Sequence, residues 1–143
     1  MRKWLFFALA LCLMAFTACG SDSSEKPDWG ITMTAENVTP TGCTVICTQS
    51  GGTVTGELLT SYDFFFTKQG RTGWKSLPVQ KQVDIVTLPL WITKNGATRW
   101  EVGWEVSYGS LEPGNYRVCK TIEHEVDGPN YEKQIFWAEF TIQ

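Results

Sequence analysis

The chain has 143 residues, of which 43% are hydrophobic and 13% aromatic, so we expect one folded domain rather than a disordered or collagen-like chain. Its formal net charge is −3, which argues against nucleic-acid binding through a basic surface.

The first 18 residues have the pattern of an export signal. A basic start, Met1-Arg2-Lys3, precedes an uncharged run over residues 4–18, which is shorter than the about 20 apolar residues of a membrane-spanning helix. The following stretch, Phe16-Thr17-Ala18-Cys19, resembles a bacterial lipobox, in which the chain is cleaved before a cysteine that carries lipid. The alternative is an ordinary signal peptide with an incidental cysteine. We therefore expect residues 1–18 to be a lipoprotein signal peptide and Cys19 to be the lipid-attachment site.

Residues 19–29 are small and polar and lack periodicity, which predicts a flexible tether. Loss of the leader removes Arg2 and Lys3 and leaves ten basic and 15 acidic residues, a net charge of −5. An acidic domain is not attracted to an anionic membrane. We therefore expect acyl chains on Cys19 to hold the exported protein to the bacterial cell membrane or outer membrane.

From residue 30 onward, apolar side chains alternate with polar ones, the period of β-strands. The clearest run is residues 100–108, in which Trp104, Val106 and Tyr108 are predicted to share one face with the tryptophan and valine that precede them. The other expected strands are residues 31–35, 43–49, 62–68, 74–77, 83–93, 115–125 and 133–142. Pro89 indicates an edge or a break in the longest apolar one. Seven or eight strands without helical spacing predict an all-β sandwich of two antiparallel sheets over residues 30–143.

A local motif refines this fold. In residues 111–118, a Pro-Gly bend leads Tyr116 into the next strand. In immunoglobulin-like (Ig-like) sandwiches, a tyrosine at this corner bonds through its hydroxyl to nearby backbone, and the residue two positions later faces the core. We therefore predict that Tyr116 is a structural tyrosine corner, that Val118 faces inward and that Cys119 faces outward.

The exported chain keeps Cys43, Cys47 and Cys119, an odd number. Strand parity directs the first two inward and the third outward, so we predict no intrachain disulfide. We expect Cys43 and Cys47 to behave as small hydrophobic residues in the core.

Several separated segments resemble a small bacterial Ig-like domain found in secreted and lipid-anchored proteins. The resemblance covers nearly all of residues 29–143. Its pieces are residues 30–33, 38–42, 48–52, 55–58, 74–75 and, most clearly, 100–104 and 108–118. The resemblance implies an Ig-like β-sandwich and implies no activity, catalytic residue or cofactor.

The residues themselves provide no catalytic constellation. His124 is the only histidine, and we expect it to lie exposed at a strand end between two glutamates that face the other way. Cys43 and Cys47 with this histidine do not form the four-ligand set of a structural zinc site. We predict no catalytic residue, no metal and no cofactor, and hence a protein that is not an enzyme.

A surface for a partner is predicted from apolar residues with outward parity. The last strands and the 62–68 strand place five residues on one face: Phe65, Arg117, Cys119, Ile135 and Trp137. Exposed apolar patches rimmed by polar groups often bind partners. The alternatives are that a loop such as residues 79–90 covers the patch or that a bulge changes the parity.

These observations favour a non-enzymatic, lipid-anchored envelope protein with one Ig-like interaction domain. Its ligand is a protein or a glycan of unknown identity and not a nucleic acid. The alternatives are a carbohydrate-binding accessory module and a protease inhibitor or envelope-stress protein.

Overall fold

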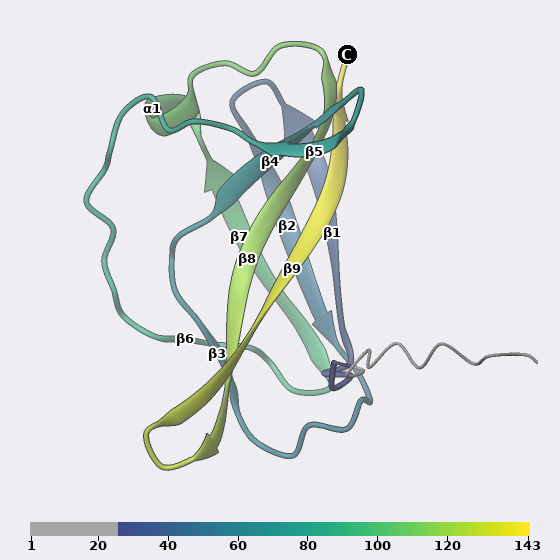
Figure 1. The fold of residues 1–143 in the computed structure, drawn as a ribbon, viewed down its shortest axis with the longest axis vertical. Helices are drawn as coiled ribbons and strands as arrows, with labels where there is room; N and C mark the ends of the chain where they lie inside the picture. Colours follow the sequence, from purple (N-terminus) through teal and green to yellow (C-terminus); the bar gives the residue numbers. More distant parts are fainter. Residues whose placement is uncertain (1–25) are drawn as a thin grey trace, which may run out of the picture.

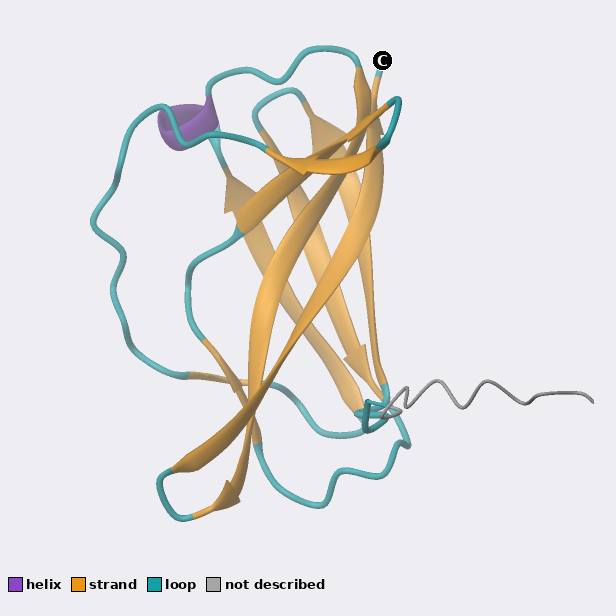
Figure 2. Cartoon of the chain, viewed as in Figure 1, coloured by secondary structure: helices purple, strands orange, loops and turns teal. Residues whose placement is uncertain are grey.

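The computed structural model describes residues 26–143, which form two antiparallel sheets and a single helical turn (Figures 1 and 2). The predicted leader and Cys19 lie outside the described residues. The elements in chain order are β1 (Ile31–Thr39), β2 (Gly42–Gln49), β3 (Leu58–Thr60), β4 (Phe65–Gly70), β5 (Gly73–Ser76), β6 (Leu90–Trp91), β7 (Gly96–Gly103), α1 (Glu105–Tyr108), β8 (Gly114–Asp127) and β9 (Asn130–Ile142).

The two sheets pack face to face, which confirms the predicted Ig-like β-sandwich. One sheet has the order β1-β2-β7. In the other, β5-β4-β8-β3-β6 are hydrogen-bonded in series and β9 pairs with the other side of β8. Both β4 and β3 pair with β8, at successive positions along it, so they are two parts of one strand interrupted at residues 61–64. The outer edge of β9 lies beside β1, which shields that edge from pairing with another chain.

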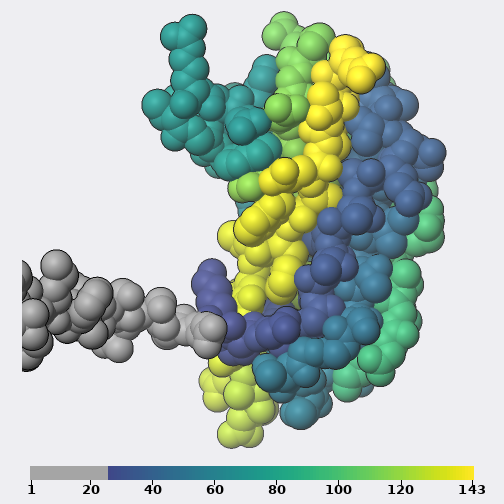
Figure 3. Space-filling view, turned by 90° about the vertical axis from the view of Figure 1, so that its right-hand side faces the viewer, coloured from purple at the N-terminus to yellow at the C-terminus, as the bar shows by residue number. Residues whose placement is uncertain are grey.

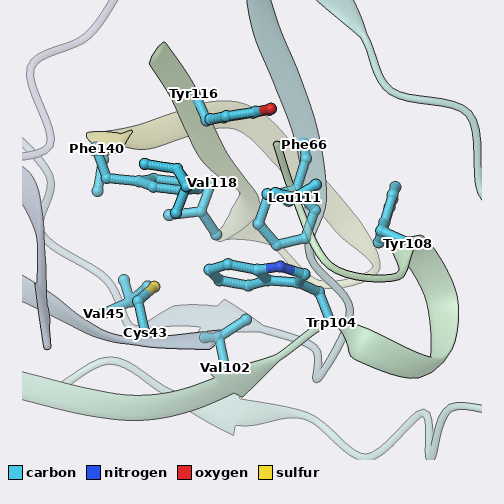
Figure 4. Packing of buried hydrophobic residues seen from close by; sticks show 12 residues of the cluster. Cys43, Val45, Phe66, Val102, Trp104, Tyr108, Leu111, Tyr116, Val118 and Phe140 are labelled. Carbon is cyan, nitrogen blue, oxygen red and sulfur yellow. The ribbon is translucent and has the colours of Figure 1, made fainter. Parts of the chain in front are cut away.

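The main core is built around the indole of Trp104 (Figure 4). Its ring centroid lies 5.1 Å from that of Phe66 and 5.5 Å from that of Phe140, and both strands that carry these rings belong to the opposite sheet. Cys43 and Val45 of β2 close the other side, as their parity predicted. Burial raises the pKa of the Cys43 and Cys47 thiols to about 11, so both stay protonated at neutral pH. All three cysteines in the described part of the chain are unpaired.

The prediction of one strand over residues 100–108 is wrong in its second half. The strand ends at Gly103, and the chain continues as α1, where Val106 is 61% exposed. Trp104 and Tyr108 are nevertheless both buried, because residues four apart share a side in a strand and also lie about one turn apart in a helix. The indole N–H of Trp104 donates to the Pro40 carbonyl at 2.8 Å, which fixes the point where the strand turns into the helix.

The corner after α1 has the expected hydrogen bond. The Tyr116 hydroxyl donates to the Glu112 carbonyl oxygen at 2.7 Å, and the Tyr116 ring stacks on Phe140 with centroids 5.6 Å apart. This bond holds the bend against the first residues of β8.

The prediction of a strand over residues 83–93 is wrong for most of its length, because only its C-terminal residues form a strand, β6. Only Leu90 and Trp91 pair, with β3, and residues 77–89 run as an exposed loop along the left of Figure 2. Pro89 lies immediately before the paired residues, and it cannot donate a backbone hydrogen bond to extend the ladder.

The ordered domain begins before residue 30, so the predicted tether is too long at its C-terminal end. Trp29 is buried in a second core cluster with Cys47, Leu58, Ile92 and Ile122. The segment before it is fixed by hydrogen bonds from the Gln134 amide to the Pro27 carbonyl and from the Thr53 backbone to the Asp28 carbonyl. The buried residues of both clusters lie between Trp29 and Ile142, and the folded unit therefore includes residues 27–29.

Candidate functional site

The predicted partner residues lie on one sheet surface, the outer face, which we define as the outward-facing side of β4, β5, β8 and β9. The strand register places Phe65, Cys119 and Trp137 in one row across three strands. The next row contains Thr67, Arg117 and Glu139. Ile135 lies along β9 beside the first row, opposite Thr121.

The five predicted residues differ in how far they reach the surface. Ile135 is 51% exposed and Trp137 is 46% exposed, whereas Phe65 and Arg117 are half-buried. Cys119 is only 4% exposed, so its inclusion as an accessible contact residue was wrong. Its side chain has the predicted outward parity, but the larger side chains beside it on neighbouring strands cover a small thiol.

Cys119 is also a poor candidate for covalent chemistry. Burial raises the pKa of its thiol, and the positive charge of Arg117 acts in the opposite direction without cancelling that effect. The thiolate is the reactive form, and a raised pKa keeps its population small at neutral pH.

Arg117 joins two tryptophans on this face. Its guanidinium carbon lies 3.9 Å from the ring centroid of Trp74 and 4.6 Å from that of Trp137. Its Nε and Nη2 atoms both donate to Oε1 of Glu139, at 3.0 and 2.7 Å. Cation–π contacts and charge-assisted bonds therefore fix Arg117 and orient both indoles.

Trp74 and Glu139 were missed from the sequence. The parity of β9 places Glu139 on the same side as Trp137, and this was an available signal. No local pattern indicates that Trp74 comes over Arg117, because it depends on how the β4–β5 hairpin bends across the sheet. Figure 3 shows that this hairpin projects beyond β9 and leaves the face below it hollowed.

Two shallow grooves adjoin the outer face. The polar groove, of about 280 Å³, lies under the hairpin between the strand ends and is lined mainly by Gln69, Trp74, Asn115, Glu139 and Thr141. An apolar groove of about 290 Å³ lies between β1 and β9, where Trp137 and Phe136 face Ile31 and Met33. Neither groove contains a nucleophile placed beside a base.

Lys120 is a buried charged residue that the sequence reading did not single out. It shares the inward parity of Tyr116 and Val118, and its side chain is fully buried. Its ammonium donates to the carbonyls of Ser61 and Asp63, at 2.5 and 3.3 Å, and lies 3.7 Å from the Phe64 ring centroid. Lys120 therefore hydrogen-bonds to backbone carbonyls in residues 61–64, the segment between β3 and β4 that does not pair with β8.

Lys120 is ionised less readily than an exposed lysine. Burial lowers its pKa from 10.5 to about 8, an effect that the negative charge of Asp63 partly offsets. A lysine with such a pKa can serve as a base or nucleophile in enzymes. Here the ammonium of a fully buried side chain is enclosed by backbone carbonyls and aromatic rings, so its role is structural.

His124 is not the exposed residue expected. Both ring nitrogens are buried without a hydrogen-bond partner among residues 26–143, and the ring lies 5.9 Å from that of Trp29. Its inward parity on β8 explains this placement. Within the same residues, His, Cys, Asp and Glu side chains form no group of three or more that could hold a metal ion.

No helix within residues 26–143 is long and apolar enough to cross a membrane. The described structure is a β-sandwich with an aromatic outer face and two shallow grooves beside it. Residues 27–137 match the family described as the bacterial Ig-like domain, and the chain belongs to that family. No curated protein and no solved structure matches it significantly. Ig-like sandwiches of this kind are generally non-catalytic and often extracellular or surface-exposed.

Proposed function

We propose that this chain is a non-enzymatic, lipid-anchored protein of the cell envelope whose Ig-like domain binds a ligand through its outer face. Membership of the bacterial Ig-like family supports an interaction domain. The basic start, the short apolar run and Cys19 support export and acylation, and the polar residues that follow provide a spacer.

The exposure of Ile135 and Trp137 carries the proposal for the outer face. Both side chains lie on a regular stretch of β9 that is paired to β8, so their position is fixed before any ligand arrives. Arg117 also holds the Trp137 ring through its cation–π contact. A preorganised aromatic residue loses little side-chain entropy on binding. Tryptophan and arginine are also enriched among the strongest contact residues of interfaces.

The binding function is tested by capture from envelope extracts with the mature chain lacking its lipidated cysteine. We expect the wild-type protein to retain a component that the double variant Ile135→Ser/Trp137→Ser does not retain. Val106→Ser is the matched control, because Val106 is at least as exposed as Ile135 and Trp137 but lies on α1. Equal capture by all three proteins would remove the outer face from the proposal.

Anchoring is tested separately by metabolic labelling of the full chain with palmitate. We expect label in the wild-type protein and none in Cys19→Ser, because the substitution removes the residue that carries the acyl chains. These chains supply the affinity for the membrane. An unlabelled wild-type protein beside a labelled control lipoprotein would refute the anchor and leave the binding function unaffected.

A protease-inhibiting function is the second candidate, and the exposed loop of residues 77–89 supports it. Val86 and Leu88 project from this loop and are well exposed. Assays against a panel of proteases test this function: inhibition that disappears in Leu88→Asp would support it, and no inhibition would exclude it.

A further inference from the structure

We infer that the polar groove on the outer face binds a saccharide. This inference rests on the proposed binding function and specifies the chemical class of its ligand. Five outward-facing side chains from the ends of β4, β5, β8 and β9 carry it: Gln69, Trp74, Asn115, Glu139 and Thr141.

The size and position of the groove limit the ligand. Its volume of about 280 Å³ is just below the usual range for small-molecule pockets. It lies on the face of the sheet beneath the hairpin, so a bound molecule contacts side chains and not a free strand edge. A peptide that adds to a sheet needs such an edge and apolar pockets for alternate side chains. The groove is mostly polar, which favours a compact ligand that carries many hydrogen-bonding groups.

A chain of hydrogen bonds orients the amides of the groove. The Thr141 hydroxyl donates to Asn115 Oδ1 at 2.9 Å, and Asn115 Nδ2 donates to Gln69 Oε1 at 3.0 Å. This direction leaves the Gln69 Nε2 group, a donor, without a partner among the described residues. The donor is thus aligned by its neighbours and is available to a ligand.

An acceptor is held nearby in the same way. Both bonds from Arg117 end on Oε1 of Glu139, and Oε2 receives no bond from the described residues. The guanidinium also neutralises the carboxylate, so the groove has no uncompensated charge of either sign. This balance disfavours phosphate and other strongly charged ligands.

Sugar hydroxyls match these features, because each can donate one hydrogen bond and accept others. One hydroxyl that donates to Glu139 and another on the same saccharide that accepts from Gln69 would use both free groups. The indole of Trp74 forms an apolar wall for the C–H groups of a sugar ring, and its contact with Arg117 holds that wall in place.

The experiment uses the mature chain without its lipidated cysteine and short oligosaccharides of glucose, mannose, galactose and N-acetylglucosamine, printed as an array and then free in solution. We expect at least one of them to bind, with nuclear magnetic resonance shifts at Trp74 and Asn115. Gln69→Leu and Glu139→Gln should each weaken binding about tenfold or more, the cost of one hydrogen bond to a fixed polar or charged group.

Glu36→Gln is the matched control for Glu139→Gln. Glu36 also pairs with an arginine, Arg99, and is exposed to a similar extent, but it lies on β1. It should leave the affinity for the sugar unchanged. Melting curves exclude unfolding as the cause of any loss.

Absence of binding to every sugar overturns the inference, as does binding that Gln69→Leu and Glu139→Gln leave intact. Capture of an envelope protein that depends on Ile135 and Trp137, without sugar binding, would overturn the saccharide inference and preserve the proposed function. Absence of both would overturn both.

Discussion

A single buried lysine makes the stability of this sandwich depend on pH. The pKa of Lys120 is about 8 in the folded chain and 10.5 when it is unperturbed. Between these values the unfolded chain binds more protons than the folded chain, so the free energy of unfolding rises with pH. Cys43 and Cys47 act in the opposite direction from about pH 8 upward, because their pKa of 9.0 in the unfolded chain rises to about 11 in the folded chain.

Lys120 alone should therefore raise the free energy of unfolding by about 1 kcal/mol from pH 8 to pH 9, and the two thiols offset part of this rise in the wild-type protein. Urea denaturation at closely spaced pH values isolates the lysine effect as the difference in stability between the wild-type protein and Lys120→Met. This difference should shift by about 1 kcal/mol in favour of the wild type over that range, whereas the difference between the wild type and Lys133→Met, at an exposed lysine paired with Glu123, should not change with pH. A difference between the wild type and Lys120→Met that stays constant from pH 8 to pH 9 would assign the pH dependence to other groups.

The tyrosine corner gives a second prediction at the scale of one residue. Tyr116→Phe removes the hydroxyl that bonds to the Glu112 carbonyl and leaves the stacked ring in place. We expect a loss of about 1–2 kcal/mol in the free energy of unfolding. Tyr131→Phe is the control, since Tyr131 is exposed. Equal stability of the two variants would show that the corner bond contributes nothing net.

Among the elements, the end of β7 distinguishes two interpretations of the alternating pattern over residues 100–108: one continuous strand, or a strand that ends at Gly103 and is followed by α1. Val102 is buried within the strand, and Val106 is exposed on α1. We predict that Val102→Ala costs about 1–3 kcal/mol and that Val106→Ala changes stability by less than about 0.5 kcal/mol. Thermal and urea denaturation would measure both. A comparable loss at both positions would restore the continuous strand that the sequence predicted.

The period-two alternation of apolar residues correctly predicted which side chains of the long strands face the core. It did not predict where the strands end. It correctly placed Cys43, Val45 and Cys47 on the core side of β2, and it predicted the hairpin of β8 and β9. Because these strands are regular, the position of a residue along its strand is enough to predict which face its side chain is on. It failed for residues 83–93, because apolar β-formers remain a loop when no neighbouring strand pairs with them.

The candidate site was predictable to the extent that it depends on parity within one strand. Ile135 and Trp137 are exposed on β9 as their positions indicated. The contact of Trp74 with Arg117 required the bend of a hairpin, and the backbone carbonyls that accept from Lys120 required the interruption between β3 and β4. Both depend on pairing between segments distant in sequence, which local patterns do not encode.

At the scale of the whole molecule, the fold requires the segment that enters it from the N-terminal side. Trp29 is 1% exposed and belongs to the second core cluster, and the centroid of its ring lies 5.8 Å from that of Phe136. The backbone on both sides is tied to the sandwich, since Gly30 accepts from the Ser50 amide and Gln49 donates to the Trp29 carbonyl. The folded domain therefore includes residues 27–29, which the sequence assigned to the tether.

A chain that begins at Lys26 should consequently be much more stable than one that begins at Gly30. Loss of the Trp29 side chain alone is expected to cost about 3–5 kcal/mol, the range for removing a buried tryptophan, so Trp29→Ala in the longer chain should account for most of the difference. Trp91→Ala is the control, because that side chain is 58% exposed and should change the free energy of unfolding by less than about 0.5 kcal/mol. Urea denaturation of the four proteins makes the comparison. If the chains starting at residues 26 and 30 unfolded at the same urea concentration, Trp29 would belong to the tether, and the second core cluster would be complete without it.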